Sequence, residues 1–221
     1  MAQAVETAPT HTTTQAEKMD TVISYLRTMK DVPYKWWDGN TWKPDNTAPF
    51  WMPDYMALDD GERRSLPRPP TAEEVSANGG TNCAGLINLA LQYFGIEPPG
   101  IHTEYPGGTG AWGAYVVWIK YNPDRVYPRG SILFRSYRNE KDQGHMAMIT
   151  TDDNSIGLNN HLIHASAVDG KVTEVPIHVV HTSTGDYSGY FECVGIPSFW
   201  LTHSWYGYCR PQRVLAGYRH Q

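Results

Sequence analysis

A polar loop passes directly into an apolar helix at Cys83, and this junction constrains the fold more than any other stretch of the chain. The residues run Thr81-Asn82-Cys83-Ala84-Gly85-Leu86-Ile87-Asn88. Thr81 or Asn82 can serve as the N-cap, because each side chain carries an oxygen that accepts from backbone N–H groups. The apolar stripe of the helix consists of Leu86, Ile87, Ala90 and Phe94, and Gly95 followed by Pro98-Pro99 predicts its end.

The thiol of Cys83 stands in the first turn of this helix. Unpaired N–H groups and the positive end of the helix dipole stabilise a thiolate there. We therefore expect the pKa of Cys83 to be lowered from its usual value of about 8.5, which would make the thiol reactive. The alternative is a buried structural cysteine, a common fate of a free thiol.

Two later segments supply histidines that could act on this thiol. Residues 144–150 predict a strand that begins at His145, with His145, Ala147 and Ile149 on the face toward the helix and two methionines on the other. Residues 160–166 predict the neighbouring strand, which places His164 beside His145, and Asp169-Gly170 starts a hairpin that continues from Val172 to Val180. His161 points to the opposite face from His164, which weakens a zinc site built on the two.

In this order the segments resemble the NlpC-type cysteine peptidases, a papain-like group whose best-known members cut cell-wall peptides. The family pattern is a helix, Pro-Tyr-x-Trp-Gly-Gly, Asp-Cys-Ser-Gly at the catalytic helix, a Pro-Gly-Asp-Leu strand, a Gly-His-Val-Gly-Ile strand and an Ile-His-Ala strand. The matching segments are Lys18 to Lys30, Pro33-Tyr34-Lys35-Trp36-Trp37-Asp38-Gly39, Asn82-Cys83-Ala84-Gly85, Pro128 to Phe134, Gly144 to Ile149 and Ile163-His164-Ala165. The resemblance covers about residues 17 to 180 and rests on the order of the motifs.

The resemblance implies an α+β fold in which the catalytic helix packs on an antiparallel β-sheet. It makes Cys83 the nucleophile, His145 the general base and acid, and His164 the residue that orients the imidazole of His145. Tyr34 would form a wall of the site, and its hydroxyl could hold the oxyanion together with the backbone N–H of Cys83. Trp36, in the same motif as Tyr34, either borders the site or packs in the core.

Two substitutions beside the nucleophile depart from the family pattern. Asn82 and Ala84 stand where the cell-wall members carry an Asp and a Ser that are associated with gripping the free amino end of the substrate. Loss of the carboxylate removes a charge-assisted hydrogen bond worth about 1.5 to 3 kcal/mol. We therefore expect a poor cell-wall dipeptidyl peptidase.

An inserted segment, Asn40 to Gly80, separates the Tyr34 motif from Cys83. It contains Trp42, Phe50, Trp51 and Tyr55, a composition typical of an ordered loop, and it either shapes the substrate site or pads the domain. The same alternatives hold for a glycine-rich loop at Gly100 to Gly113, whose backbone we expect to be mobile or closely approached. The aromatic tail from Ser198 to Tyr208 is expected to cover a sheet face.

Composition fits one globular domain, residues 17–221, behind a flexible tail at 1–16. Of 221 residues, 40% are hydrophobic and 12% aromatic, enough for a sizeable core. A net charge of −5 without a basic run argues against nucleic acid or an anionic membrane as partner. No signal peptide or membrane span is recognisable, and the odd set Cys83, Cys193 and Cys209 suggests reduced thiols, so we expect a cytoplasmic protein.

The function that we expect is a cysteine hydrolase that cleaves an amide or peptide bond through a thioester on Cys83, without cofactor or metal. Its substrate would be a peptide or a small amide. The alternative is an acyl or amide transferase on the same scaffold, which a loop that excludes water would favour. A catalytically inactive binding module is a third possibility, and the retained Cys83, His145 and His164 argue against it.

Overall fold

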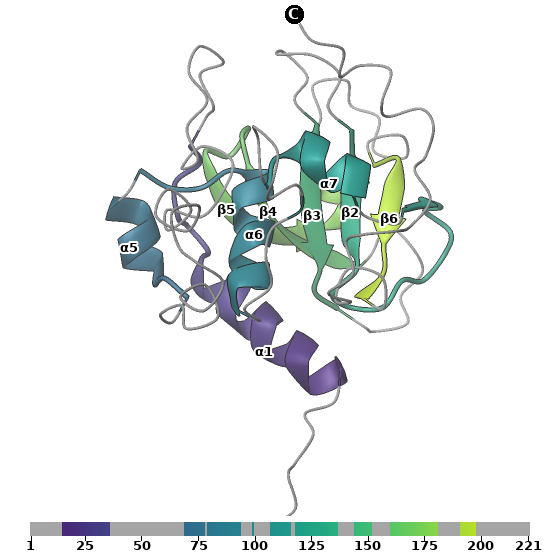
Figure 1. Cartoon of the computed structure of the whole chain (residues 1–221), viewed down its shortest axis with the longest axis horizontal. Coiled ribbons are helices and arrows are strands. Elements are labelled where there is room, and N and C mark those ends of the chain that lie inside the picture. The colour runs from purple at the N-terminus through teal and green to yellow at the C-terminus, as the bar shows by residue number, and fades with distance from the viewer. Residues whose placement is uncertain are drawn as a thin grey trace, which may run out of the picture.

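The computed structural model of the chain describes residues 15–35, 69–77, 79–93, 99, 107–115, 118–136, 144–151, 160–180 and 191–197. Within these residues an antiparallel sheet carries the fold (Figure 1). Its strands are β1 (Ile119–Lys120), β2 (Ile132–Arg135), β3 (His145–Ile149), β4 (His161–Ser166), β5 (Lys171–Pro176) and β6 (Cys193–Gly195). The order across the sheet is β1-β6-β2-β3-β4-β5, so β6 lies between β1 and β2.

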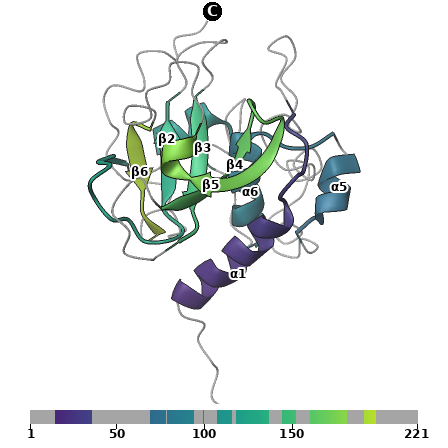
Figure 2. The ribbon, with the colours of Figure 1, turned by 180° about the vertical axis from the view of Figure 1, so that it is seen from behind.

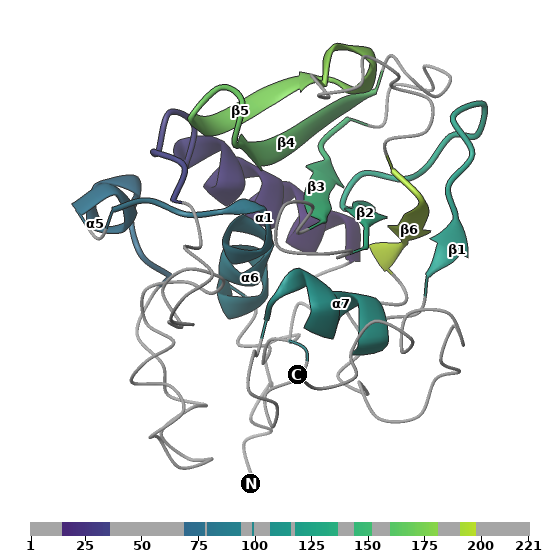
Figure 3. The same cartoon turned by 90° about the horizontal axis from the view of Figure 1, so that it is seen from above.

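Helix α6 (Cys83–Tyr93) packs on β3 and β4, and α1 (Gln15–Thr28) packs against α6. In the view from behind, the sheet lies in front of α6 (Figure 2). A short helix, α7 (Thr109–Tyr115), lies on the same side of β2 and β3 as α6 (Figure 3). The expected α+β class, with a helix from Cys83 packed on an antiparallel sheet, describes this architecture.

Both faces of the central strands are buried, each under its own apolar cluster. Met146 and Met148 of β3 belong to the cluster that contains α6 and α1. Ala147 and Ile149 belong to the second cluster, on the opposite face. The prediction that the His145 face of this strand turns toward the helix was therefore wrong. The two long methionine side chains fill the space under α6.

The glycine-rich segment 107–115 forms part of the core. Trp112 of α7 is fully buried, and its indole N–H donates to Oδ1 of Asn88 on α6 at 3.0 Å. Nδ2 of Asn88 in turn donates to the carbonyl of Gly107 at 2.9 Å. A Cβ on Gly107 would lie 2.4 Å from Nδ2 of Asn88, so the expectation of a closely approached backbone is confirmed there. The described part of this segment is helical, whereas the sequence predicted a loop.

Two of the predicted element boundaries differ from those of the structure, and one helix was not predicted. The first helix begins at Gln15, so the last two residues of the expected tail belong to α1, and the rest of that tail lies outside the described residues. Strand β5 ends at Pro176, because proline donates no ladder hydrogen bond, and a 3-10 helix, Ile177–Val179, follows. Helix α5 (Ala72–Ala77) was not predicted, although Thr71 and Glu74 form a capping box at its start.

Candidate active site

The first turn of α6 is capped by Asn82. Oδ1 of Asn82 accepts a hydrogen bond from the backbone N–H of Gly85 at 2.8 Å, and its carbonyl accepts from the N–H of Leu86 at 2.9 Å. Of the two N-cap candidates, Asn82 is therefore the one used, whereas the hydroxyl of Thr81 donates to the carbonyl of Asn82. This cap leaves Cys83 as the first residue of the helix.

The Cys83 thiol is buried, with 6% of the residue exposed. Burial raises the pKa of this thiol. Hydrogen bonds from the backbone N–H groups of Met146, Ala84 and Cys83 itself act in the opposite direction, as does the charge of Arg135. The prediction of a lowered pKa was therefore wrong, because desolvation of the thiolate outweighs stabilisation by the helix N-terminus. The amide of Met146 places the thiol at the start of β3, one residue from His145.

His145 and His164 form a hydrogen-bonded pair across β3 and β4. Nε2 of His145 lies 2.8 Å from Nδ1 of His164, and the two rings meet at 84°. Both residues are buried, at 7% and 4% exposed. Burial lowers the pKa of His164 to about 4, and burial, His164 and Arg135 lower the pKa of His145 well below its usual value. Both imidazoles are therefore neutral at neutral pH.

Strand alternation puts His145 on the face of β3 that carries Ala147 and Ile149, whereas Cys83 belongs to the cluster on the α6 side. The thiol and the imidazole therefore meet β3 from its two faces, at the same end of the strand. The ring of Phe191, from the second cluster, lies 6.0 Å from the ring of His145.

Tyr34 is positioned by a short extended segment between the β4–β5 turn and α6. Its backbone N–H donates to the carbonyl of Gly170 at 2.8 Å, and the residue forms an isolated bridge with Thr81. The N–H of Lys35 donates to Thr81 at 3.1 Å, and the N–H of Thr81 donates to Pro33 at 3.0 Å. Tyr34 therefore lies beside the residue two positions before Cys83.

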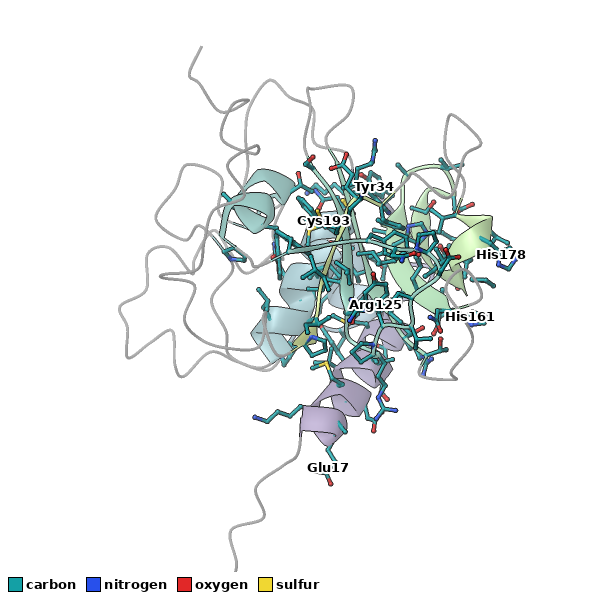
Figure 4. All side chains as sticks on the ribbon, turned by 90° about the vertical axis from the view of Figure 1, so that its right-hand side faces the viewer. Glu17, Tyr34, Arg125, His161, His178 and Cys193 are labelled. Atoms are coloured by element: carbon teal, nitrogen blue, oxygen red, sulfur yellow. The ribbon has the colours of Figure 1, made fainter. Side chains whose placement is uncertain are left out.

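The remaining histidines and candidate residues are placed as follows. His161, which was expected to point away from His164, and His178, which the sequence did not single out, lie at the edge of the molecule, apart from Tyr34 (Figure 4). Ala84 is buried in the core beside Cys83. Trp36, most of the segment Asn40 to Gly80, and the tail from Ser198 to Tyr208 lie outside the described residues. Within the described ranges no group of three or more His, Cys, Asp or Glu residues is arranged to hold a metal ion.

Arg135 is the charged residue of the site that the sequence did not reveal. It ends β2 directly opposite His145, and its charge lowers the pKa values of both His145 and Cys83. A positive charge here favours the thiolate and disfavours the imidazolium. The signal that could have found it is the pairing of its strand with the strand that begins at His145.

Comparisons with known proteins found a distant structural likeness. No family model matches the chain, and no curated protein is similar to it. Among solved structures, the P60 domain of an antigen from M. avium subspecies paratuberculosis is similar, with 19% sequence identity and a TM-score of 0.44. The match covers 83% of this chain and 96% of that domain. In the ranges that the structure describes, no helix combines the length and the apolar character needed to cross a membrane.

Proposed function

We propose that the chain is a cysteine hydrolase that cleaves an amide or peptide bond through a thioester on Cys83. The observation that carries the proposal is that three groups lie at the same end of β3. These are a thiol at the start of α6, the backbone amide of Met146 beside it, and the hydrogen-bonded pair of His145 and His164. A nucleophile, a base and a group that orients the base are the parts that this chemistry needs.

The raised pKa of Cys83 and the lowered pKa of His145 favour a neutral thiol and a neutral imidazole in the resting site. The proton then leaves the thiol as its sulfur attacks the carbonyl carbon. Nε2 of His145 is engaged with His164, so Nδ1 receives this proton. The transfer requires Nδ1 to reach the thiol at the first residue of β3 while Nε2 keeps its hydrogen bond to His164.

The negative charge that develops on the carbonyl oxygen needs hydrogen-bond donors. The backbone N–H of Cys83 is in the first turn of α6, and Tyr34 is held beside Thr81, so the amide and the phenol are the donors that we assign. Collapse of this intermediate breaks the C–N bond, and the amine takes the proton from Nδ1 of His145. Water, deprotonated by His145, then attacks the thioester and restores the thiol.

Asn82 and Ala84 bear on which substrates this site accepts. The side-chain oxygen of Asn82 already accepts from Gly85, and Ala84 has no polar side-chain atom. Neither supplies a negative charge, so we propose a substrate without a free ammonium group next to the scissile bond. The transferase alternative depended on the inserted segment as a cover, and no described residue favours it.

A library of electrophilic amide mimics, such as peptidyl nitriles, would test this function. Mass spectrometry would show which members modify Cys83, and the matching amides would then be assayed for hydrolysis. We expect labelling of Cys83 to be lost in Cys83→Ser and strongly reduced in His145→Ala. His161→Ala is the matched control, because this histidine lies on the same sheet outside the pair. Equal labelling of Cys193 and Cys83 would contradict the proposal.

A further inference from the structure

A cavity of about 160 Å³ lies against His164. Its walls come from β4, the β4–β5 turn, β5 and the segment after β5, and its polar residues are His164, Asp169, Lys171 and Thr173. A water molecule occupies about 30 Å³ in the liquid, so the cavity has room for water. The function proposed above uses His145 and Nδ1 of His164, and it does not use this space.

Two buried polar atoms belong to residues that line this cavity on neighbouring strands. His164 and Thr173 are directly opposite each other in the β4–β5 ladder, so their side chains share a face of the sheet. Nε2 of His164 and Oγ1 of Thr173 are both buried, and neither has a hydrogen-bond partner among the described residues. Buried polar atoms are almost always hydrogen-bonded, to protein or to water. One water between them would satisfy both atoms.

The partner of Nε2 decides which nitrogen of His145 can act as base. A neutral imidazole carries one N–H. If the N–H of His164 is on Nε2, then Nδ1 of His164 accepts a hydrogen bond from Nε2–H of His145. In that case Nδ1 of His145 is the basic nitrogen. If the N–H of His164 is on Nδ1 instead, His145 accepts at Nε2 and carries its proton on Nδ1, where it cannot take one from the thiol.

Neither charged residue of the cavity wall, Asp169 or Lys171, competes as a hydrogen-bond donor to Nε2 of His164, so the partner of this nitrogen is an acceptor. The ammonium of Lys171, a donor that would enforce the wrong tautomer, forms an ion pair with Asp31. The carboxylate of Asp169 acts on His164 through its charge and belongs to an exposed residue. The hydroxyl of Thr173 is the uncharged polar group of the wall, and it can donate its proton to the bridging water, whose oxygen also accepts from Nε2–H of His164.

We propose that Thr173 is a positioning residue that, through a water in this cavity, holds the proton of His164 on Nε2 and so makes Nδ1 of His145 the base for Cys83. The inference rests on the function proposed above. It adds Thr173, on β5, as a fourth residue to the proposed set of Cys83, His145 and His164.

Nitrogen-15 NMR of the histidine side chains tests the assignment without any substrate. In the full chain at pH 7, Nε2 of His164 should give the signal of a protonated nitrogen and Nδ1 that of an unprotonated one, with His164→Gln used to assign the peaks. Thr173→Val, which has the same shape without the hydroxyl, should shift the tautomer balance by roughly two- to tenfold. Thr173→Ser should restore it.

A proton on Nδ1 of His164 in the unsubstituted protein would overturn the proposal, and this outcome needs no variant that folds. An unchanged tautomer in Thr173→Val would also overturn it. The same spectra of Cys83→Ser separate the two inferences, because the tautomer does not depend on the thiol. If Nε2 stays protonated there while no amide mimic modifies Cys83 in the unsubstituted chain, the proposed function fails and the assignment of Thr173 stands.

Discussion

Nε2 of His145 lies 2.8 Å from Nδ1 of His164, in a part of the sheet where both rings are almost completely buried. A neutral pair of this kind shares one proton between the two facing nitrogens. A charge on either ring would be desolvated, and the nearby Arg135 further disfavours it on His145. The pair is therefore neutral at rest, and in the proposed reaction it would carry a proton only briefly.

The free energy of unfolding should fall in acid because of the pair of His145 and His164. The pKa of His164 is lowered from 6.5 to about 4, so between these values the unfolded chain binds a proton that the folded chain does not. The stabilising contribution is complete above pH 6.5 and is lost as the pH falls through 4. At 1.36 kcal/mol per unit, His164 alone accounts for about 3 kcal/mol. His145 acts in the same direction.

Urea unfolding from pH 4 to pH 8 would measure this dependence. His164→Gln should flatten the curve, whereas substitution of the exposed His178 by Gln should leave it unchanged. A curve that keeps its full slope without His164 would show that other groups cause the acid lability.

Alkylation of Cys83 should follow its raised pKa. In a Cys193→Ser, Cys209→Ser background, the rate with iodoacetamide should rise by about tenfold per pH unit up to pH 8, because the thiolate fraction rises in that proportion below the pKa. Cys83→Ser in the same background should show no labelling. A rate that is already constant at pH 6 would instead indicate a preformed ion pair of thiolate and imidazolium.

Substitution of Asn82 should change the preference for the amino end of the substrate. Asn82→Asp keeps an oxygen for the cap on Gly85 and adds a carboxylate beside the nucleophile. Discrimination in favour of free over N-acylated peptide ends should grow by about 1.5 to 3 kcal/mol, roughly 10- to 150-fold in kcat/KM. Asn82→Ser, which caps without a charge, is the control. If the unsubstituted protein already prefers free-ended cell-wall peptides strongly, another residue supplies the charge.

Gly80 should be required for the placement of Tyr34. Its φ is +104°, and a Cβ there would lie 2.0 Å from the carbonyl oxygen of Pro33, which accepts from Thr81. Gly80→Ala should therefore displace the segment that holds Tyr34 and reduce labelling of Cys83 by the amide mimics.

Gly79→Ala provides a matched comparison for this effect. Gly79 has a φ of +92°, and the nearest atoms to a Cβ there belong to the Lys35 side chain, at an ordinary contact distance of 3.7 Å. Backbone strain of about 1 to 2 kcal/mol applies in both variants, while the clash applies only at Gly80. Equal labelling in the two variants would show that the Pro33 contact does not position the site.

The sequence predicted much of the fold because its signals are local. The cap at Asn82, the strand that begins at His145 and the strand around His164 each follow from residue type and spacing. The pairing of His145 with His164 follows once the two strands are neighbours. These are the parts in which one short segment determines its own conformation.

The parts that failed depend on what surrounds a segment. The pKa of Cys83 is set by burial, which no single motif encodes, and this outweighs the helix N-terminus. The helical segment around Trp112 is glycine-rich, so the sequence predicted a loop. Asn88, buried on the separate helix α6, holds this segment in place through hydrogen bonds. Arg135 lies opposite His145, and Thr173 lies opposite His164, because of the strand register, which is established only when the sheet is assembled.

Two backbone hydrogen bonds join Thr81 to Pro33 and Lys35, and they bring together the two ends of the segment from residue 36 to residue 80. Inside that span, α5 is anchored by the buried Val75, and the carbonyl of Pro70 accepts from the hydroxyl of Tyr25 at 2.9 Å. Each doubling in the length of a closed loop costs only about 0.6 kcal/mol. Residues 36–68 could thus be exchanged for other sequences with Tyr34 and Cys83 left in register, and new substrate preferences of the proposed active site could be selected in this way.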